Sequence, residues 1–248
     1  MIYPSDLKEL DRRQGDESPE HSFSYVRRTS HLDNTPRTSK AMGIDAELST
    51  IGMWGEDVST KLGALFEKLP QTADEMIVRE GLCFIRLPGN TARWILIGGK
   101  ANIHLFKETH ADALTEDNQR WQLLDIQSNV ATIHPETSAL FTPHMLGYPD
   151  LNAVSFKKGC YTGQEVIART QYLGKAKRHL YHASVASGKM PRAGDALLDD
   201  AGNEMGTVVN AALNPTSECY EFLAVIQDQA VSIALYWDQL LINYFPIP

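Results

Sequence analysis

The sequence predicts an α+β protein in which a mixed α/β region precedes a small all-β region. Apolar residues recur at helical spacing between Glu56 and Leu69, and apolar runs typical of strands occupy 76–98. Short β-rich runs separated by turn residues fill the chain after Gly174. We therefore predict three segments: a polar segment over 1–49, a mixed α/β region over 50–174, and a small β-barrel or sandwich over 175–248.

The first segment is polar and rich in Ser, Arg, Asp and Pro, without sustained periodicity. Such a segment buries too little apolar surface to offset the entropy lost on ordering. We expect loop or disorder there, with a short helix in Ser5–Arg13. The first residues contain no apolar core, so no signal peptide is expected.

The mixed region should begin with a helix over Glu56–Leu69, which Pro70 ends. Two strands are predicted next, Met76–Leu87 and Arg93–Gly98, joined by the turn residues Pro88-Gly89-Asn90. Cys83 falls in the first of these strands, and we expect its side chain to belong to the core.

Later in the mixed region, Asn102–Leu114 is predicted as a helix with one apolar side. Trp121–Ile126 begins a further element, which a proline-containing loop connects to the motif described below. In the third segment, the predicted strands are His179–Val185, Ala196–Asp199, Gly206–Ala211, Tyr220–Ile226 and Val231–Tyr236. The tetrapeptide Asp200-Ala201-Gly202-Asn203 is typical of a hairpin turn.

Composition limits the classes of function. The net charge is −8, from 31 acidic and 23 basic residues, which disfavours broad nonspecific binding to phosphate backbones. The three cysteines are far apart and form no CxxC pair, so neither a disulfide framework nor a zinc site is expected, and a reducing cytoplasm fits best. No apolar run is long enough to cross a bilayer. His104 and His110 lack the spacing of metal ligands.

One nonapeptide, KKGCYTGQE over 157–165, carries the candidate chemistry. Thr162 and Glu165 fit a capping box, so a helix should start there and end at Gly174. Cys160 would then lie just before a helix N-terminus, where free amides favour a thiolate. The simpler alternatives stay open: Cys160 can be a small buried turn residue, and Glu165 a capping residue only.

The nonapeptide and its surroundings resemble the YgfZ-type folate-binding proteins, called tRNA-modifying proteins, which are relatives of the glycine-cleavage T-protein. LNAVSFKKGCYTGQEVIART is similar to that family's motif segment, and Phe141-Thr142-Pro143-His144 is similar to its upstream FIPQ. Trp121–Ile126 resembles the strand that precedes it, and Gly206-Thr207-Val208 a strand of the terminal barrel. The resemblance runs from about residue 50 to the end.

The resemblance implies a T-protein-like fold: a folate-binding α/β region over 50–174, incomplete here, and a C-terminal β-barrel over 175–248. It implies tetrahydrofolate or a derivative as cofactor, a role in maintaining iron–sulfur enzymes, and a required thiol at Cys160 whose reaction is undefined. The partners implied are folate and iron–sulfur enzymes or their assembly machinery. Direct contact with tRNA is disfavoured by the net charge of −8. The cofactor-binding residues it implies are Lys158, Tyr161, Gln164, Glu165, Arg169, Gln127 and Trp121.

The chain departs from the family pattern in two ways. The usual first strands, with a GQVT-like segment, are absent, so we expect the chain to enter the fold partway. In the family's IEAG segment, the acid near the pterin ring is replaced by Gln127. A neutral hydrogen bond is about half as strong as a charge-assisted one, so folate binding is expected to be weakened.

Three other readings remain. These alternatives are an aminomethyltransferase of the T-protein class, a cysteine hydrolase, and a folded relative that binds no ligand. The presence of KGCYTGQE and the loss of the acid at Gln127 count against the first. A hydrolase needs a positioned base and an oxyanion hole, and the sequence offers no convincing base.

Overall fold

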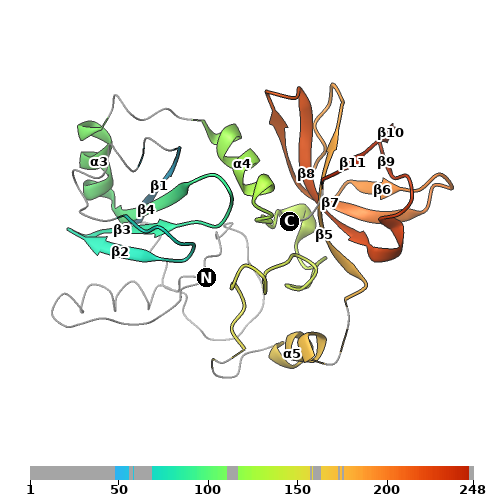
Figure 1. The fold of residues 1–248 in the computed structure, drawn as a ribbon, viewed down its shortest axis with the longest axis horizontal. Helices are drawn as coiled ribbons and strands as arrows, with labels where there is room; N and C mark the ends of the chain where they lie inside the picture. The colour runs from blue at the N-terminus through green and yellow to red at the C-terminus, as the bar shows by residue number, and fades with distance from the viewer. Residues whose placement is uncertain are drawn as a thin grey trace. The chain divides into compact units, whose positions relative to one another are not determined.

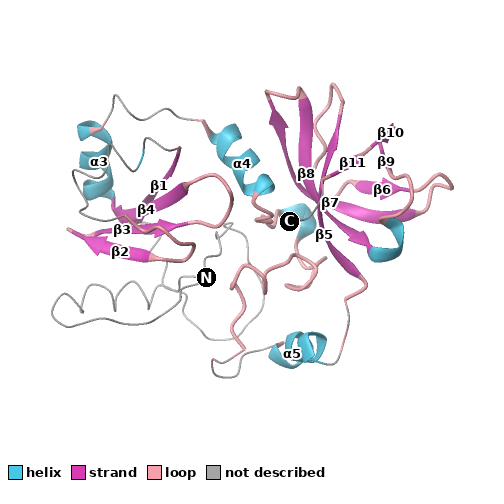
Figure 2. Ribbon diagram, viewed as in Figure 1, coloured by secondary structure: helices cyan, strands magenta, loops and turns pink. Residues whose placement is uncertain are grey.

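A computed structural model describes residues 48–55, 58, 69–110, 117–156, 158, 163–172, 174 and 176–245. These residues form two compact units, one within 48–110 and one within 117–245. Each unit has a sheet of its own (Figures 1 and 2). The fold class is therefore the predicted one, a mixed α/β protein with a barrel-like sheet near its C-terminus. The predicted boundary near residue 175 stays a prediction.

The first unit is a four-stranded antiparallel sheet of order β1-β4-β3-β2 with one described helix. Its elements are β1 Leu48–Trp54, β2 Met76–Arg79, β3 Leu82–Arg86, β4 Arg93–Gly99 and α3 Lys100–Thr109. Helix α3 follows β4 directly and buries Ile103 and Phe106 in the core of this unit. Phe84 and Leu96, from neighbouring strands of the sheet, are fully buried in the same core.

Two predictions in the first unit are corrected. Met76–Leu87 is not one strand but the hairpin of β2 and β3, because Glu80 (φ 53°) and Gly81 (φ 73°) turn the chain between them. Two positive φ values suit the two-residue turn that matches the twist of a hairpin. The predicted Asn102 helix is α3, which already ends at Thr109.

Two of the predicted features of this unit can be followed further. Cys83 is buried, as expected, and burial raises the pKa of its thiol to about 12, so it is an unreactive core residue. The helix predicted over Glu56–Leu69 lies outside the described residues except at its Val58 and Leu69 positions.

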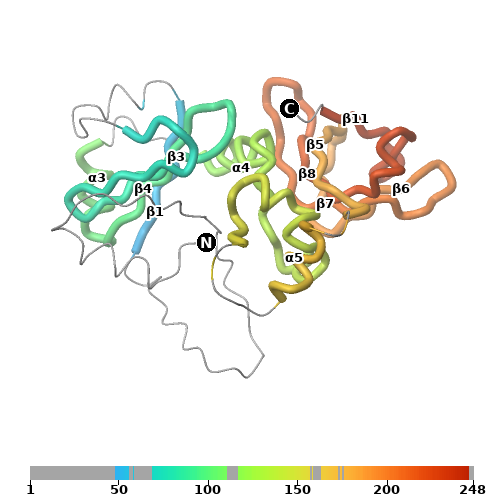
Figure 3. Tube along the Cα trace, turned by 60° about the horizontal axis from the view of Figure 1, so that its bottom comes forward, coloured from blue at the N-terminus to red at the C-terminus, as the bar shows by residue number. Residues whose placement is uncertain are grey.

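The second unit contains a seven-stranded antiparallel sheet of order β10-β9-β6-β7-β8-β5-β11. Its strands are β5 Arg178–Val185, β6 Ala196–Leu198, β7 Glu204–Asn214, β8 Cys219–Gln227, β9 Tyr236–Trp237, β10 Leu240–Leu241 and β11 Asn243–Tyr244. The two outermost strands, β10 and β11, are separated by Ile242 alone. The sheet must therefore curl until its edges nearly meet, which makes it barrel-like (Figure 3).

Both faces of this sheet bury apolar side chains. The inner face carries Phe222, Ala224 and Ile226 of β8 into the barrel core. The outer face carries Leu223 and Val225, which pack with residues of helix α4, Asn118–Gln127. Because side chains of a strand alternate between faces, one continuous apolar run in β8 supplies both cores.

Two further predictions are wrong in this unit. The resemblance implied a strand at Trp121–Ile126, but these residues lie in helix α4. The start of α4 is capped by the Asp117 carboxylate, which accepts from the Arg120 amide at 2.8 Å. Val231–Tyr236 is not a strand either, since the 3-10 helix η3 Asp228–Ala230 and a turn precede β9. The turn Asp200–Asn203 is confirmed: the Asp199 carboxylate accepts from the backbone amides of Ala201 and Asn203.

Candidate functional site

The motif nonapeptide is only partly described. Cys160, Tyr161 and Thr162 lie outside the described residues, so the capping box and the thiol environment stay predictions. The helix predicted after them is present as α5, Gln164–Tyr172. The amide of Gly174 donates to the Arg169 carbonyl at 2.9 Å, which closes the end of α5 as predicted.

The predicted binding residues near the motif share one short stretch. Lys158, Glu165 and Arg169 are exposed, and Gln164 is half-buried. The Arg169 guanidinium lies 3.3 Å from the Glu165 carboxylate, one helical turn away. An ion pair this exposed contributes little to stability, and both side chains are available to a ligand.

Helix α5 is held by the upstream segment that resembled FIPQ. A ring nitrogen of His144 (Nε2) lies 3.0 Å from the side-chain oxygen of Gln171. The Phe156 ring lies 6.4 Å from the His144 ring and 5.9 Å from the Tyr172 ring. The structure therefore brings together the two segments on which the resemblance was based, although 11 residues separate His144 from Phe156 in sequence.

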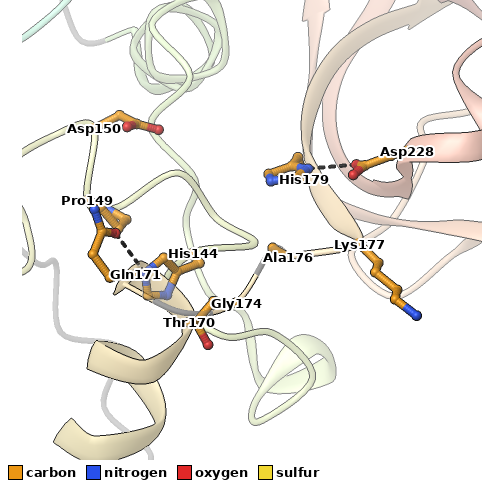
Figure 4. A pocket seen from close by; sticks show the side chains of 10 residues that line it. All are labelled: His144, Pro149, Asp150, Thr170, Gln171, Gly174, Ala176, Lys177, His179 and Asp228. Atoms are coloured by element: carbon orange, nitrogen blue, oxygen red, sulfur yellow. Dashed lines mark hydrogen bonds and ion pairs between the residues drawn. The ribbon is translucent and has the colours of Figure 1, made fainter.

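An open hollow of about 660 Å³ lies beside the C-terminal half of α5 (Figure 4). Its lining includes His144 and Gln171 on one side. On the other side, Nδ1 of His179 lies 2.6 Å from the Asp228 carboxylate. Lys177 and Asp150 also border it. None of the predicted binding residues that the structure describes lines this hollow, and the sequence analysis did not predict it. Within the described ranges, no cluster of three or more His, Cys, Asp or Glu side chains is arranged to hold a metal ion.

The other two predicted binding residues lie on α4. Trp121 is half-buried near the start of the helix, and Gln127, its last residue, is exposed. The side-chain amide of Gln127 donates to both carboxylate oxygens of Glu221, on β8, at 3.3 Å each. The last residue of α4 is thus hydrogen-bonded to a carboxylate of the barrel-like sheet.

Glu221 is 4% exposed and sits in a polar cluster on the outer face of the barrel. Besides Gln127, its carboxylate accepts hydrogen bonds from the side-chain amide of Asn214, on β7, and from Nε2 of His182, on β5, at 2.8 Å. The His182 ring stacks on Phe245, with centroids 4.3 Å apart. A buried carboxylate is tolerated only with such partners.

The strand pairing explains why these side chains meet. His182 pairs with Leu223 across β5 and β8, and Asn214 pairs with Cys219 across β7 and β8. Residues 219, 221 and 223 lie on one face of β8, so Glu221, His182 and Asn214 project from the sheet face that α4 covers, and Gln127 reaches Glu221 from α4. Burial raises the pKa of Glu221, but the bonds from His182, Asn214 and Gln127 outweigh it and leave the pKa below its ordinary value.

Sequence reasoning missed Glu221, His182 and Asn214. A signal existed: Glu221 is the one acidic residue inside the apolar run of Cys219–Gln227. A charge in such a run must find partners when the strand is buried. Its partners could not be identified, because they come from other strands and from α4.

No protein-family model matches the chain. It is 31% identical over 205 residues to the tRNA-modifying protein YgfZ of Serratia proteamaculans, which covers 77% of this chain and 61% of that protein. The YgfZ proteins of Yersinia enterocolitica and Pectobacterium atrosepticum are 32% and 31% identical, over 71% and 69% of this chain and 56% and 53% of theirs. The chain is a relative of the YgfZ proteins. It spans less than two thirds of the length of these relatives.

The fold has a solved counterpart. The glycine cleavage system aminomethyltransferase T of Bartonella henselae aligns with a TM-score of 0.56 over 81% of this chain and 59% of the other, at 12% identity. At this identity the likeness concerns the fold, which is the T-protein-like fold expected from the motif. No helix within the described ranges has the length and apolar character needed to cross a membrane.

Proposed function

We propose that the chain is a folate-binding accessory protein that supports the assembly or repair of iron–sulfur enzymes and, through them, the methylthiolation of tRNA. The observation that carries this proposal is the similarity to proteins named tRNA-modifying protein YgfZ. The motif KKGCYTGQE and the T-protein-like fold support it. Tetrahydrofolate or a derivative is the proposed cofactor.

In this proposal Cys160 supplies an essential thiol, and Lys158, Tyr161, Gln164, Glu165 and Arg169 surround the ligand with Gln127 and Trp121. The proposed protein partners are iron–sulfur enzymes or their assembly machinery, in the cytoplasm. Direct contact with tRNA is not part of the proposal, because a net charge of −8 is unfavourable for phosphate backbones.

The test is complementation of a bacterial strain that lacks its YgfZ protein. We expect the chain to restore methylthiolated tRNA, measured by mass spectrometry, and the Cys160→Ser variant to fail. Cys219→Ser is the matched control, since this half-buried cysteine lies outside the motif and the variant should complement. Full rescue by Cys160→Ser would remove the thiol from the proposal.

The folate component is tested separately, by the thermal shift of the purified chain on addition of tetrahydrofolate. A ligand that binds only the folded state raises the melting temperature, so an unchanged temperature at saturating concentrations contradicts folate binding by this chain. That result would favour a relative that binds no ligand.

A second candidate is a tetrahydrofolate-dependent aminomethyltransferase, favoured by the structural likeness to the T-protein of Bartonella henselae. The neutral Gln127 counts against it. Transfer of the methylene carbon of a lipoamide-bound aminomethyl group to tetrahydrofolate, with release of the nitrogen as ammonia and of the free thiol of dihydrolipoamide, would support this candidate over the accessory role.

A further inference from the structure

The side-chain amide of Gln127 has a fixed orientation. An ionised carboxylate can only accept hydrogen bonds, so Gln127 must turn its NH₂ group, not its oxygen, toward Glu221. The assignment therefore follows from the chemistry of the partner rather than from a choice between two similar atoms. The carbonyl oxygen of the same amide points away from Glu221.

This carbonyl oxygen is available to a ligand. Gln127 is exposed, and its oxygen accepts no hydrogen bond from the described part of the chain. We propose that Glu221 is a positioning residue, which holds Gln127 so that this oxygen accepts a hydrogen bond from a ring N–H of the folate pterin. The inference rests on the proposed function, because it assigns roles within the folate site.

Glu221 can hold an orientation because it is itself immobilised. His182 and Asn214 donate to its carboxylate from the strands on either side, and the residue is nearly inaccessible to water. Both bonds favour the ionised form, which keeps Glu221 an acceptor toward Gln127. The exposed amide is thus anchored to the rigid sheet, as a specific site requires.

The hydrogen bond between Gln127 and Glu221 explains why residue 127 is neutral. A glutamate at 127 would face the Glu221 carboxylate at hydrogen-bonding distance, and two like charges there repel unless one takes a proton. The identities of residues 127 and 221 are therefore coupled. The double variant Gln127→Glu with Glu221→Gln keeps one acid and one amide at these positions. Its charged acceptor is then residue 127, which faces the proposed ligand.

The first experiment measures the dissociation constant of tetrahydrofolate by anaerobic calorimetry. Gln127→Met keeps the side-chain length but removes the acceptor, and we expect about 3- to 10-fold weaker binding, the value of one neutral hydrogen bond. Gln122→Met, at an exposed position of the same helix, is the matched control and should bind as the wild type does.

The second experiment separates positioning from mere structure. Glu221→Gln can offer either a donor or an acceptor, so it no longer fixes the amide, and we expect binding to weaken about 3-fold or more. Gln127→Glu should weaken it further at neutral pH, where the two carboxylates repel each other. The double exchange should restore binding to the wild-type value or better, which a purely structural defect would not do.

Three outcomes overturn the inference while wild-type binding stands: unchanged affinity in Gln127→Met, unchanged affinity in Glu221→Gln, or a double variant no better than its singles. If Glu221→Gln does not fold, side-chain hydrogen exchange in the wild type decides instead. The Gln127 amide protons should exchange more slowly than those of Gln122, and equal rates overturn the inference. A wild type that binds no tetrahydrofolate overturns the proposed folate site itself.

Discussion

At the scale of single residues, the Glu221 carboxylate shows how hydrogen bonds offset the cost of burying a charge. It is almost fully buried, and three side chains from three different elements donate to it. Removing a partner from a buried charge costs more than the same bond contributes, because the remaining group is left unsatisfied. The cluster is therefore expected to affect stability as well as the proposed ligand site.

Glu221→Gln should lower the free energy of unfolding by about 1–3 kcal/mol at pH 7, the cost of disrupting a buried charged hydrogen-bond cluster. The pKa of Glu221 lies below its ordinary value in the folded chain. Its stabilising effect is thus full above the ordinary pKa and is lost as the pH falls through the folded pKa. Urea denaturation from pH 7 to pH 3 should show the two proteins converging in stability.

The control for this prediction is Glu218→Gln, at an exposed position of the turn before β8. It should change stability by less than about 0.5 kcal/mol across the same range. If the difference between wild type and Glu221→Gln stayed constant down to pH 3, the pKa argument would be wrong.

At the scale of elements, β7 and β8 form the centre of the barrel-like sheet, and Gly206 allows their close approach. A Cβ added there would lie 2.9 Å from Cγ1 of Ile226 and 3.0 Å from the backbone oxygen of Val225. The second of these atoms belongs to a paired strand and cannot move freely. The position therefore tolerates glycine alone without a shift of the sheet.

Gly206→Ala is expected to destabilise the second unit by about 1–3 kcal/mol, the usual cost of overpacking a core. Gly188→Ala is the matched control, because an added Cβ meets no atom within 4 Å there and the backbone φ is not positive. Thermal denaturation of both variants measures the difference. Equal melting temperatures would contradict the packing argument.

At the scale of the whole molecule, the two units have separate apolar cores. The core of the first unit contains residues from 51 to 106, and the two cores of the second contain residues from 123 to 242. Helix α4 closes the outer core of the barrel through Leu123 and Ile126. The second unit thus supplies the apolar side chains that pack on both faces of its own sheet.

We predict that the fragment 117–248 folds without the first unit, because its buried side chains are supplied within it. Circular dichroism should show one cooperative thermal transition, within a few degrees of the corresponding transition in the full chain. A fragment that lacks a cooperative transition would show that the units depend on one another. Ile126→Ala tests whether α4 packs on the sheet in the fragment as it does in the full chain. It should lower the free energy of unfolding of the fragment by about 2–5 kcal/mol.

The sequence alone determined the features that depend on neighbouring residues. The helix after the motif and its end at Gly174 follow from local patterns, as does the hairpin turn near Gly202. Short patterns are less informative: the run Trp121–Ile126 did not distinguish a buried helix from a buried strand, and the strand implied there by the resemblance is a helix, α4. The family could be recognised for a similar reason, since KKGCYTGQE is continuous in sequence.

Only the tertiary structure decided what surrounds Gln127. Its partner Glu221 is 94 positions away, and the other two donors come from β5 and β7. Strand register and the packing of α4 bring these groups together, and neither can be deduced from local propensity. The sequence has a neutral residue where the family has an acid, and the fold places a buried acid directly behind it. That carboxylate is stable there because α4, β5 and β7 each supply a hydrogen-bond donor.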